Sequence, residues 1–244
     1  MIAHRFTFCF EDDMAIYPGV QALAFDLFGT ILDLDSSLKP FITTFLKDQQ
    51  AAVSPEQFWD RWRARQRIEQ FQDTLMMLGH SGYLETVRRA LVYTLGLSNV
   101  QASPGAIRNL MEAWKELSPF PDVLPALERL KGRYSLVVLS NGDPHFLDHL
   151  VKNRVRWAFQ AVISVSPIGA FKPHPAVYRR AAGLLALEMD ACLMVSANAF
   201  DVVGARACGY KGAYVNRYNL PYDDSPYRPH VTVRDFTELA DALL

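Results

Sequence analysis

Short apolar runs alternate with amphipathic stretches along most of the chain. Five runs have the length and apolar content of strands that are buried on both faces, as in a parallel sheet: residues 20–25, 134–139, 161–165, 191–195 and 212–215. Helical patterns lie between the later runs, at residues 122–131, 143–155 and 175–187 and in a stretch that ends at Cys208. This order of strands and helices predicts an α/β fold with a doubly wound parallel sheet of the Rossmann-like kind.

A long helical segment interrupts the alternation directly after the first strand, and no strand pattern returns until about Tyr134. One helix begins at Ser54, where Ser before Pro is a strong start signal, and ends by Met77. Two more helical patterns follow at residues 83–95 and 103–117. About 80 helical residues exceed what a crossover between parallel strands needs. We therefore expect a helical cap domain inserted into the sheet domain.

These patterns predict three parts of the chain. Residues 1–16 form an N-terminal arm of unassigned purpose, residues 17–35 and 118–244 form the core domain, and residues 36–117 form the cap domain. The arm holds three phenylalanines followed by an acidic run, and no signal-peptide apolar region develops.

Composition narrows the classes of protein that the chain could be. Half of its 244 residues are hydrophobic and 21% are charged, which is typical of a globular protein with a sizeable core. The net charge of -1 provides no field that would attract nucleic acid or an anionic membrane, and no apolar run is long enough to span a membrane. Three cysteines fit neither a disulfide framework nor a metal-binding spacing, which favours the cytoplasm. The oligomeric state stays open, a homodimer included.

Polar side chains follow three of the predicted strands and one turn. The set is Asp26, Thr30, Ser140, Asn141, Lys172, Ser196, Asn198 and Asp201. Each residue alone has an ordinary explanation, as a helix cap or a solvated charge. The carboxyl ends of parallel strands, however, meet at one edge of the sheet, where ligands bind in open α/β folds. We therefore expect these side chains to form a single site.

Four motifs around the helical insertion carry a family resemblance. Residues 26–30 read Asp-x-x-Gly-Thr, residues 140–142 Ser-Asn-Gly, residues 172–173 Lys-Pro and residues 196–201 Ser-x-Asn-x-x-Asp. In this order they resemble the haloacid dehalogenase superfamily and, within it, the type II (S)-2-haloacid dehalogenases. The similarity runs from about Gln21 to the end of the chain. The first motif is shared with many phosphatases, whereas the fourth is far more diagnostic of the dehalogenase branch.

The residues themselves favour displacement at carbon over phosphoryl transfer. Phosphatases of the superfamily carry the pattern Asp-x-Asp at the first motif, and their second Asp transfers a proton. Phe28 occupies that position here and cannot transfer one. Ser196 and Asn198 are neutral where an acidic metal ligand would be expected, although magnesium prefers carboxylates. A lysine beside Asp26 and Asp201 would weaken their attraction for a divalent cation further. We expect neither a metal nor a cofactor.

The resemblance implies a hydrolytic dehalogenase that displaces halide from short 2-haloalkanoic acids and inverts the reacting carbon. Asp26 would attack C2 and form an aspartyl ester, because a carboxylate held in line is a competent nucleophile and a halide needs no general acid to depart. Thr30 and Lys172 would orient and stabilise the Asp26 carboxylate. Water would then hydrolyse the ester, and the residues implied for its placement are Ser196, Asn198 and Asp201.

Further residues are implied for the two ends of the substrate. Its carboxylate would be held by Ser140 and by backbone N–H groups near Leu27 and Phe28. For the halide, Arg61, Arg63 and Arg65 cannot all face the cleft, since successive members point about 200° apart on a helix. The pattern Trp-Arg-x-x-Gln at residues 62–66 resembles the halide site of the family and selects Arg63, although a solvated helix face stays an alternative. Asn141, Tyr83 and Phe200 would complete the pocket.

Two departures from the family bear on the substrate. Phe28 stands where several relatives carry Tyr, and Arg67 stands where an apolar residue is expected. Substrate size therefore stays open, with haloacetates and fluoroacetate in scope. Two other functions also stay open: a phosphatase or phosphonatase with an atypical site, and a non-catalytic protein that binds a small acid.

Overall fold

The core of the molecule is a six-stranded parallel sheet. The computed structural model describes residues 17–77 and 79–244. The sheet strands are β1 (Ala22–Phe25), β4 (Ser135–Ser140), β5 (Ala161–Ser164), β6 (Cys192–Ser196), β7 (Lys211–Val215) and β8 (Val231–Val233). Their order across the sheet is β5-β4-β1-β6-β7-β8, and every neighbouring pair is parallel. The predicted doubly wound α/β fold is confirmed.

Strand β1 lies at the centre of this sheet because all four of its side chains are apolar and buried. It pairs with β4 on one side and with β6 on the other, so the chain reverses its direction across the sheet at this strand. In doubly wound sheets, ligands bind beyond the carboxyl ends of the strands at such a reversal. The topology therefore brings the ends of β1, β4 and β6 to one place.

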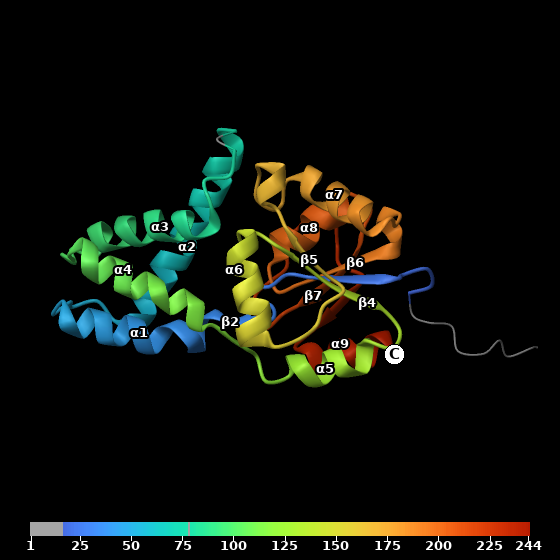
Figure 1. Ribbon diagram of the computed structural model, residues 1–244, viewed down its shortest axis with the longest axis horizontal. Helices are drawn as coiled ribbons and strands as arrows, with labels where there is room; N and C mark the ends of the chain where they lie inside the picture. The colour runs from blue at the N-terminus through green and yellow to red at the C-terminus, as the bar shows by residue number, and fades with distance from the viewer. Residues whose placement is uncertain (1–16, 78) are drawn as a thin grey trace, which may run out of the picture.

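Helices cover both faces of the sheet. Helices α7 (Pro175–Leu185) and α8 (Ala199–Ala207) lie on one face, and α5 (Val123–Leu130) and α9 (Phe236–Leu243) lie on the other (Figure 1). Between β4 and β5, helix α6 (Pro144–His149) continues as a π-helical turn over Leu150–Val155. Apolar side chains of the sheet and of the helices on its two faces pack together and form the hydrophobic core.

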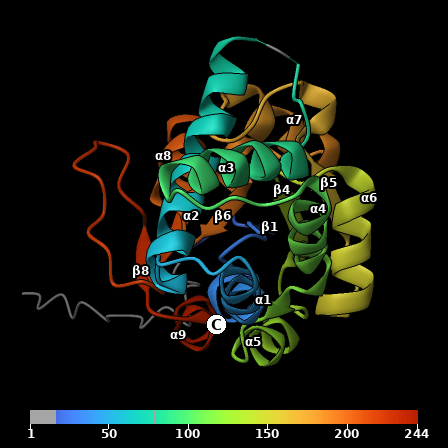
Figure 2. The same ribbon diagram turned by 90° about the vertical axis from the view of Figure 1, so that its left-hand side faces the viewer.

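Of the helices between β1 and β4, the first four pack together beside the sheet, and we call them the cap helices. They are α1 (Leu34–Asp48), α2 (Pro55–Leu75), α3 (Tyr83–Leu97) and α4 (Pro104–Glu112), the last extended by a 3-10 turn over Ala113–Glu116. Ser54 caps α2 by accepting a hydrogen bond from the Gln57 N–H, as the sequence predicts. Viewed from their side, the cap helices lie in front of the sheet (Figure 2).

The predicted domain boundaries stay a prediction. Helix α1 begins at Leu34, two residues before the predicted start of the cap domain, and the predicted arm over residues 1–16 lies outside the described residues.

Four short elements differ from the expected pattern. Strands β2 (Leu32–Asp33) and β3 (Ser118–Pro119) form an antiparallel pair at the two ends of the helical insertion, where we expected no strand. Two residues are too few to show the alternation that marks a strand. At the other end of the chain, β8 and α9 follow β7, although the expected repeat ended at Val215. None of the described helices is long and apolar enough to cross a membrane.

Candidate active site

Asp26 follows β1 directly, and its carboxylate is buried and held from three directions. Its Oδ2 accepts hydrogen bonds from Thr30 Oγ1 at 2.8 Å and from Asn198 Nδ2 at 2.9 Å. Its Oδ1 accepts only a longer bond, 3.3 Å from Lys172 Nζ. Oδ2 is thus well occupied by neutral donors, whereas Oδ1 keeps an available lone pair.

The turn after β1 explains how these groups meet. Gly29 has a φ of +83°, in the left-handed region that glycine adopts without strain, so the chain turns sharply and returns Thr30 to the carboxylate. The Thr30 hydroxyl also accepts a hydrogen bond of 2.9 Å from the Ala197 backbone N–H, in the loop after β6. One hydroxyl therefore fixes both the Asp26 side chain and the neighbouring strand end.

Lys172 lies between two carboxylates in the interior. Its Nζ is 3.3 Å from Asp26 Oδ1 and 2.8 Å from Asp201 Oδ2, and the residue is 1% exposed. Its backbone N–H donates to Asn141 Oδ1 at 2.9 Å, which ties the loop carrying the lysine to the end of β4. A cation shared in this way allows two buried acids to lie close together.

Asp201, in the first turn of α8, has a second donor that the sequence did not reveal. The Tyr178 hydroxyl, on α7, donates to Asp201 Oδ1 at 2.8 Å. Burial raises the pKa of Asp201 above its ordinary value, with Lys172 opposing the shift and Asp26 adding to it. Burial likewise raises the pKa of Tyr178, so this hydroxyl stays protonated and acts as a donor. Tyr178 lies within a helix whose apolar pattern gives no sign of a polar role.

Two cavities meet at this edge of the sheet. An inner cavity of about 20 Å³ is lined by Asp26, Phe28, Arg63, Arg67, Gln70, Tyr83, Asn141, Lys172, Asn198, Phe200 and Asp201. An outer pocket of about 550 Å³ lies beside it. Arg63, Arg67 and Asn198 line both spaces and so form the wall between them. The inner cavity has room for about one water molecule.

The cap helices supply one wall of the inner cavity through α2 and α3. Arg63 Nη1 donates to Gln66 Oε1 at 2.7 Å, and the Tyr83 ring stacks on Phe28 with 4.0 Å between the ring centroids. Burial raises the pKa of Tyr83 to about 12, although the nearby Arg63 guanidinium opposes the shift. Tyr83 therefore presents a neutral hydroxyl.

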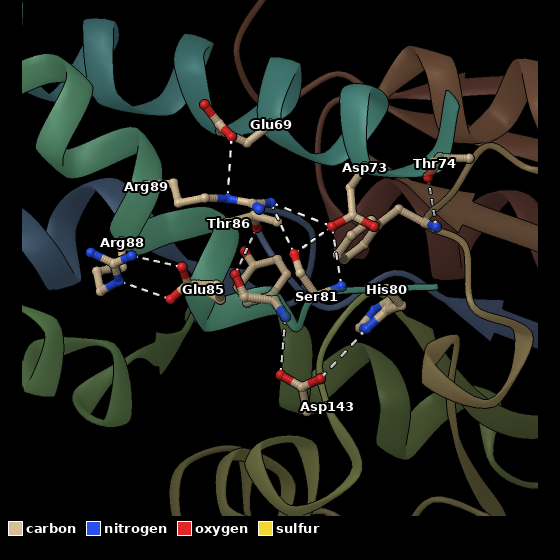
Figure 3. A network of polar contacts seen from close by, with 12 residues as sticks. Glu69, Asp73, Thr74, His80, Ser81, Glu85, Thr86, Arg88, Arg89 and Asp143 are labelled. Atoms are coloured by element: carbon tan, nitrogen blue, oxygen red, sulfur yellow. Dashed lines mark hydrogen bonds and ion pairs between the residues drawn. The ribbon is translucent and has the colours of Figure 1, made fainter. Parts of the chain in front are cut away.

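A polar network fixes the start of α3 and, with it, Tyr83 (Figure 3). The Tyr83 backbone N–H donates to Asp143 Oδ2 at 3.0 Å, so a carboxylate of the core holds the first turn of a cap helix. Nearby, Asp73 accepts from the Ser81 hydroxyl and backbone N–H and pairs with Arg89 at 3.3 Å. These contacts tie Ser81 and Tyr83, on either side of Gly82, to α2, α3 and the core.

The other two arginines of the predicted trio point away from the cavities. Arg61 Nη1 donates to Ser98 Oγ at 3.0 Å. Arg65 pairs with Glu69 at 2.6 Å, and its guanidinium lies 4.1 Å from the centroid of the Tyr93 ring. Only Arg63 of the three reaches the cavity walls, while its contact with halide stays a prediction.

Several predicted residues lie behind the wall of the inner cavity. Thr30, Ser196, Ser140 and Leu27 are fully buried and are absent from the lining. Ser196 Oγ accepts from the Asn198 backbone N–H at 3.1 Å, which supports the Asn198 loop. Ser140 Oγ accepts a long bond of 3.5 Å from the Gly142 N–H. The Leu27 and Phe28 backbone N–H groups donate to no acceptor within the described chain, and their predicted contact with the substrate carboxylate stays a prediction.

Sequence reasoning assigned no role to Arg67 or Gln70, although both line the inner cavity. They follow Arg63 at spacings of four and seven residues, which places all three on one face of α2. This spacing was the available signal.

As for metals, no cluster of three or more His, Cys, Asp or Glu side chains suited to an ion occurs among residues 17–77 and 79–244.

Comparison with known proteins identifies the family. A family profile described as haloacid dehalogenase-like hydrolase matches residues 20–209. The chain belongs to this family. The family-level resemblance read from the four motifs is confirmed, and with it the prediction of a hydrolase.

Individual relatives of this haloacid dehalogenase-like hydrolase are dehalogenases by name. (S)-2-haloacid dehalogenase H-109 of Pseudomonas putida is 31% identical over 92% of this chain and 98% of its own length. Haloacetate dehalogenase H-2 of Moraxella sp. is 31% identical over 88% of this chain and 93% of its own. The structure of L-2-haloacid dehalogenase from Xanthobacter autotrophicus with chloropropionic acid covalently bound matches with a TM-score of 0.78 and 27% identity, over 91% of this chain and 97% of that one. The predicted class, hydrolases acting on carbon–halide bonds, is the class of these relatives.

Proposed function

We propose that this protein is a hydrolytic dehalogenase that converts short 2-haloalkanoic acids into 2-hydroxy acids through an ester on Asp26. The observation that carries the proposal is the Asp26 carboxylate itself. One oxygen is fixed by Thr30 and Asn198, and the other has only the long contact with Lys172. This carboxylate lines a small cavity that Arg63 borders from the cap helices. A pre-oriented anion facing a cation suits displacement of an anionic leaving group.

In the first step, a lone pair of Asp26 Oδ1 attacks C2 of the substrate from the side opposite the halogen. The new C–O bond forms as the carbon–halogen bond breaks, and the configuration at C2 inverts. The electron pair of the broken bond leaves with the halide, toward Arg63 and Asn141. No proton moves in this step, so Phe28 is tolerated where a phosphatase needs an acid.

In the second step, water attacks the carbonyl carbon of the Asp26 ester. Asp201 accepts one proton of the water, and the raised pKa of its carboxyl group suits it to that task. The tetrahedral intermediate collapses and expels the hydroxy acid, which carries the second proton, and the Asp26 carboxylate is restored with one oxygen from water. Asp201 then releases its proton to solvent, which completes the cycle. Asn198 donates to the Asp26 side chain throughout.

Single turnover in heavy-oxygen water tests this mechanism. With enzyme in excess over 2-chloropropionate, we expect the label in the Asp26 side chain, detected by mass spectrometry of the peptide that contains it. Asp26→Asn should lower halide release by at least about 10⁴-fold, the scale of losing a catalytic nucleophile. Label found only in the hydroxy acid would show direct attack by water and would refute the ester.

The phosphatase alternative makes an opposite prediction. A magnesium-dependent phosphatase loses activity in EDTA and regains it with magnesium, whereas we expect halide release to be unchanged by either addition. Hydrolysis of p-nitrophenyl phosphate without halide release would favour the alternative. Binding of haloacids without turnover would instead point to a non-catalytic protein.

A further inference from the structure

Three polar residues of α2 line the inner cavity, at spacings that place them on one helical face. Arg63, Arg67 and Gln70 lie four and then three residues apart, and within about 60° of one another around the helix axis. Arg63 has a proposed partner in the departing halide. Arg67 and Gln70 take no part in the mechanism above.

Arg67 is a half-buried cation without an anion. Its Nη2 donates to Asn198 Oδ1 at 3.2 Å, but its Nε is buried and has no partner. No carboxylate of the described residues lies within ion-pair distance of it. Burial, together with the neighbouring Arg63 charge, lowers the pKa of Arg67 to about 10. A guanidinium removed from water in this way is stabilised by an anion that the chain itself does not supply.

Gln70 places a second unused donor beside Arg67. The residue is 4% exposed, and its Oε1 accepts from Asn141 Nδ2 at 3.3 Å. The orientation of both amides follows from the Lys172 backbone N–H, which donates to Asn141 Oδ1 and so leaves Asn141 Nδ2 to face Gln70. Gln70 Nε2 therefore points away from Asn141, and it is buried without a partner.

The charges around the inner cavity leave room for one anion. Three cations, Lys172, Arg63 and Arg67, border it together with the two carboxylates of Asp26 and Asp201. One positive charge is thus left over, and a substrate with one carboxylate balances it. Ser140, the side chain expected to hold that carboxylate, does not reach the cavity lining.

We propose that Arg67 and Gln70 form the binding site for the substrate carboxylate, with Arg63 one turn away for the halide. The inference rests on the proposed function and specifies its substrate class: small 2-halo acids with a single carboxylate and little or no alkyl group at C2. Arg67 stands where the family resemblance predicts an apolar residue, so a charged guanidinium, and not an apolar side chain, lines this part of the cavity. Haloacetates are therefore the expected best substrates.

Direct binding of the two anions separates the two sites. Isothermal titration of acetate, a carboxylate without a leaving group, and of bromide uses the intact protein and its Arg67→Leu and Gln70→Leu variants. We expect Arg67→Leu to weaken acetate binding by roughly ten- to hundredfold, the scale of a charged hydrogen bond, and bromide binding by far less. Arg67→Lys should retain part of the affinity. Arg65→Leu, which removes the same charge from the face of α2 that contacts Tyr93 of α3, is the matched control and should change neither.

Unchanged acetate binding in both Arg67→Leu and Gln70→Leu would overturn the proposal. If Arg67→Leu fails to fold, acetate binding is measured with Arg67→Gln and Gln70→Leu, and unchanged affinity in both would overturn the proposal. In turnover, Arg67→Leu should raise KM for chloroacetate more than it lowers kcat, and should improve 2-chlorobutyrate relative to chloroacetate. Acetate binding that depends on Arg67 in a protein that releases no halide would uphold the subsite and reject the proposed function. Halide release with Arg67-independent acetate binding would do the reverse.

Discussion

The core side and the cap side of the inner cavity differ in how their polar groups are satisfied. On the core side, Lys172 bonds to both Asp26 and Asp201. Asp26 also accepts hydrogen bonds from Thr30 and Asn198, and Asp201 accepts one from Tyr178. On the cap side, polar atoms of Gln66, Arg67, Gln70 and Tyr83 are buried without partners. Every such unpartnered side-chain atom in the described part of the chain belongs to residues 66–114.

The difference separates two tasks. The two acids proposed for catalysis and the lysine have their arrangement before any ligand arrives, which is the preorganisation that favours charge development in a transition state. The cap side has buried donors that lack acceptors. Such donors destabilise the protein unless a ligand supplies the acceptors. Changes on the core side should therefore affect folding and chemistry together, whereas changes on the cap side should affect ligand binding and leaving-group departure.

Lys172→Met should have the largest effect, because it leaves two buried acids without their shared cation. We expect the free energy of unfolding at pH 7 to fall by about 3–5 kcal/mol and halide release to fall at least about a thousandfold. Urea denaturation and halide assays measure both. Lys152→Met, at an exposed ion pair with Asp148, is the control and should change stability by about 0.5 kcal/mol or less. Equal losses in the two variants would contradict the role of Lys172.

Arg63→Ala comes next and tests the cap side. A guanidinium that meets the halide stabilises charge that is small in the ground state and nearly full in the transition state, so kcat should fall roughly a hundredfold. The loss should be greater for chloride than for bromide, the better leaving group. Arg63→Lys should recover part of it, since an ammonium lacks the planar fork. Arg61→Ala and Arg65→Ala should do far less, and similar losses in all three would exclude Arg63 as the halide residue.

Tyr178→Phe should have a moderate effect on the core side. It removes the donor to Asp201 Oδ1, so we expect a loss of about 1–2 kcal/mol in unfolding free energy and roughly tenfold slower hydrolysis of the ester. Tyr134→Phe removes a comparable buried bond, 2.8 Å to the Leu243 carbonyl, far from the site. It should lower stability similarly and leave turnover unchanged. Slower turnover in both variants would indicate a general effect of stability.

Asp73→Asn should have the smallest effect and depends on pH. Burial alone would raise the pKa of Asp73, but the bonds from Ser81 and Arg89 outweigh it and lower the pKa below its ordinary value. An acid with a lowered folded-state pKa stabilises the protein above its unfolded pKa, about 4, and loses that contribution as pH falls through the folded value. The variant should thus be about 1 kcal/mol less stable at pH 7, with the gap closing in acid. Thermal unfolding from pH 3 to 7 measures it, and a gap that widens in acid would contradict this account.

Much of the core could be predicted from the sequence because its signals are local. Continuous apolar runs mark strands buried on both faces, and a carboxylate directly after the first run lies at the edge of the sheet where ligands bind in such folds. The Lys-Pro motif predicts that Lys172 belongs to the site, and the topology of the sheet places the loop that carries it beside Asp26. By contrast, β2 and β3 hold two residues each, which is too short for any periodic signal.

The cap side was harder to predict because its assignments depend on tertiary packing. The spacing of Arg63, Arg67 and Gln70 shows that they share a helical face, but only the packing of α2 against the core shows that this face borders the cavity. Tyr178 lies among the apolar positions of α7, where a buried aromatic residue is usual and its hydroxyl gives no separate signal.

An inner cavity of about 20 Å³ has room for a water molecule but not for a haloacid, which is several times larger. Side chains of its wall must therefore move apart before the proposed substrate can enter. Since Arg63, Arg67 and Gln70 lie on one face of α2, a shift of this single helix would open the cavity toward the outer pocket. Entry of the acid and enclosure of the reaction thus depend on the same element.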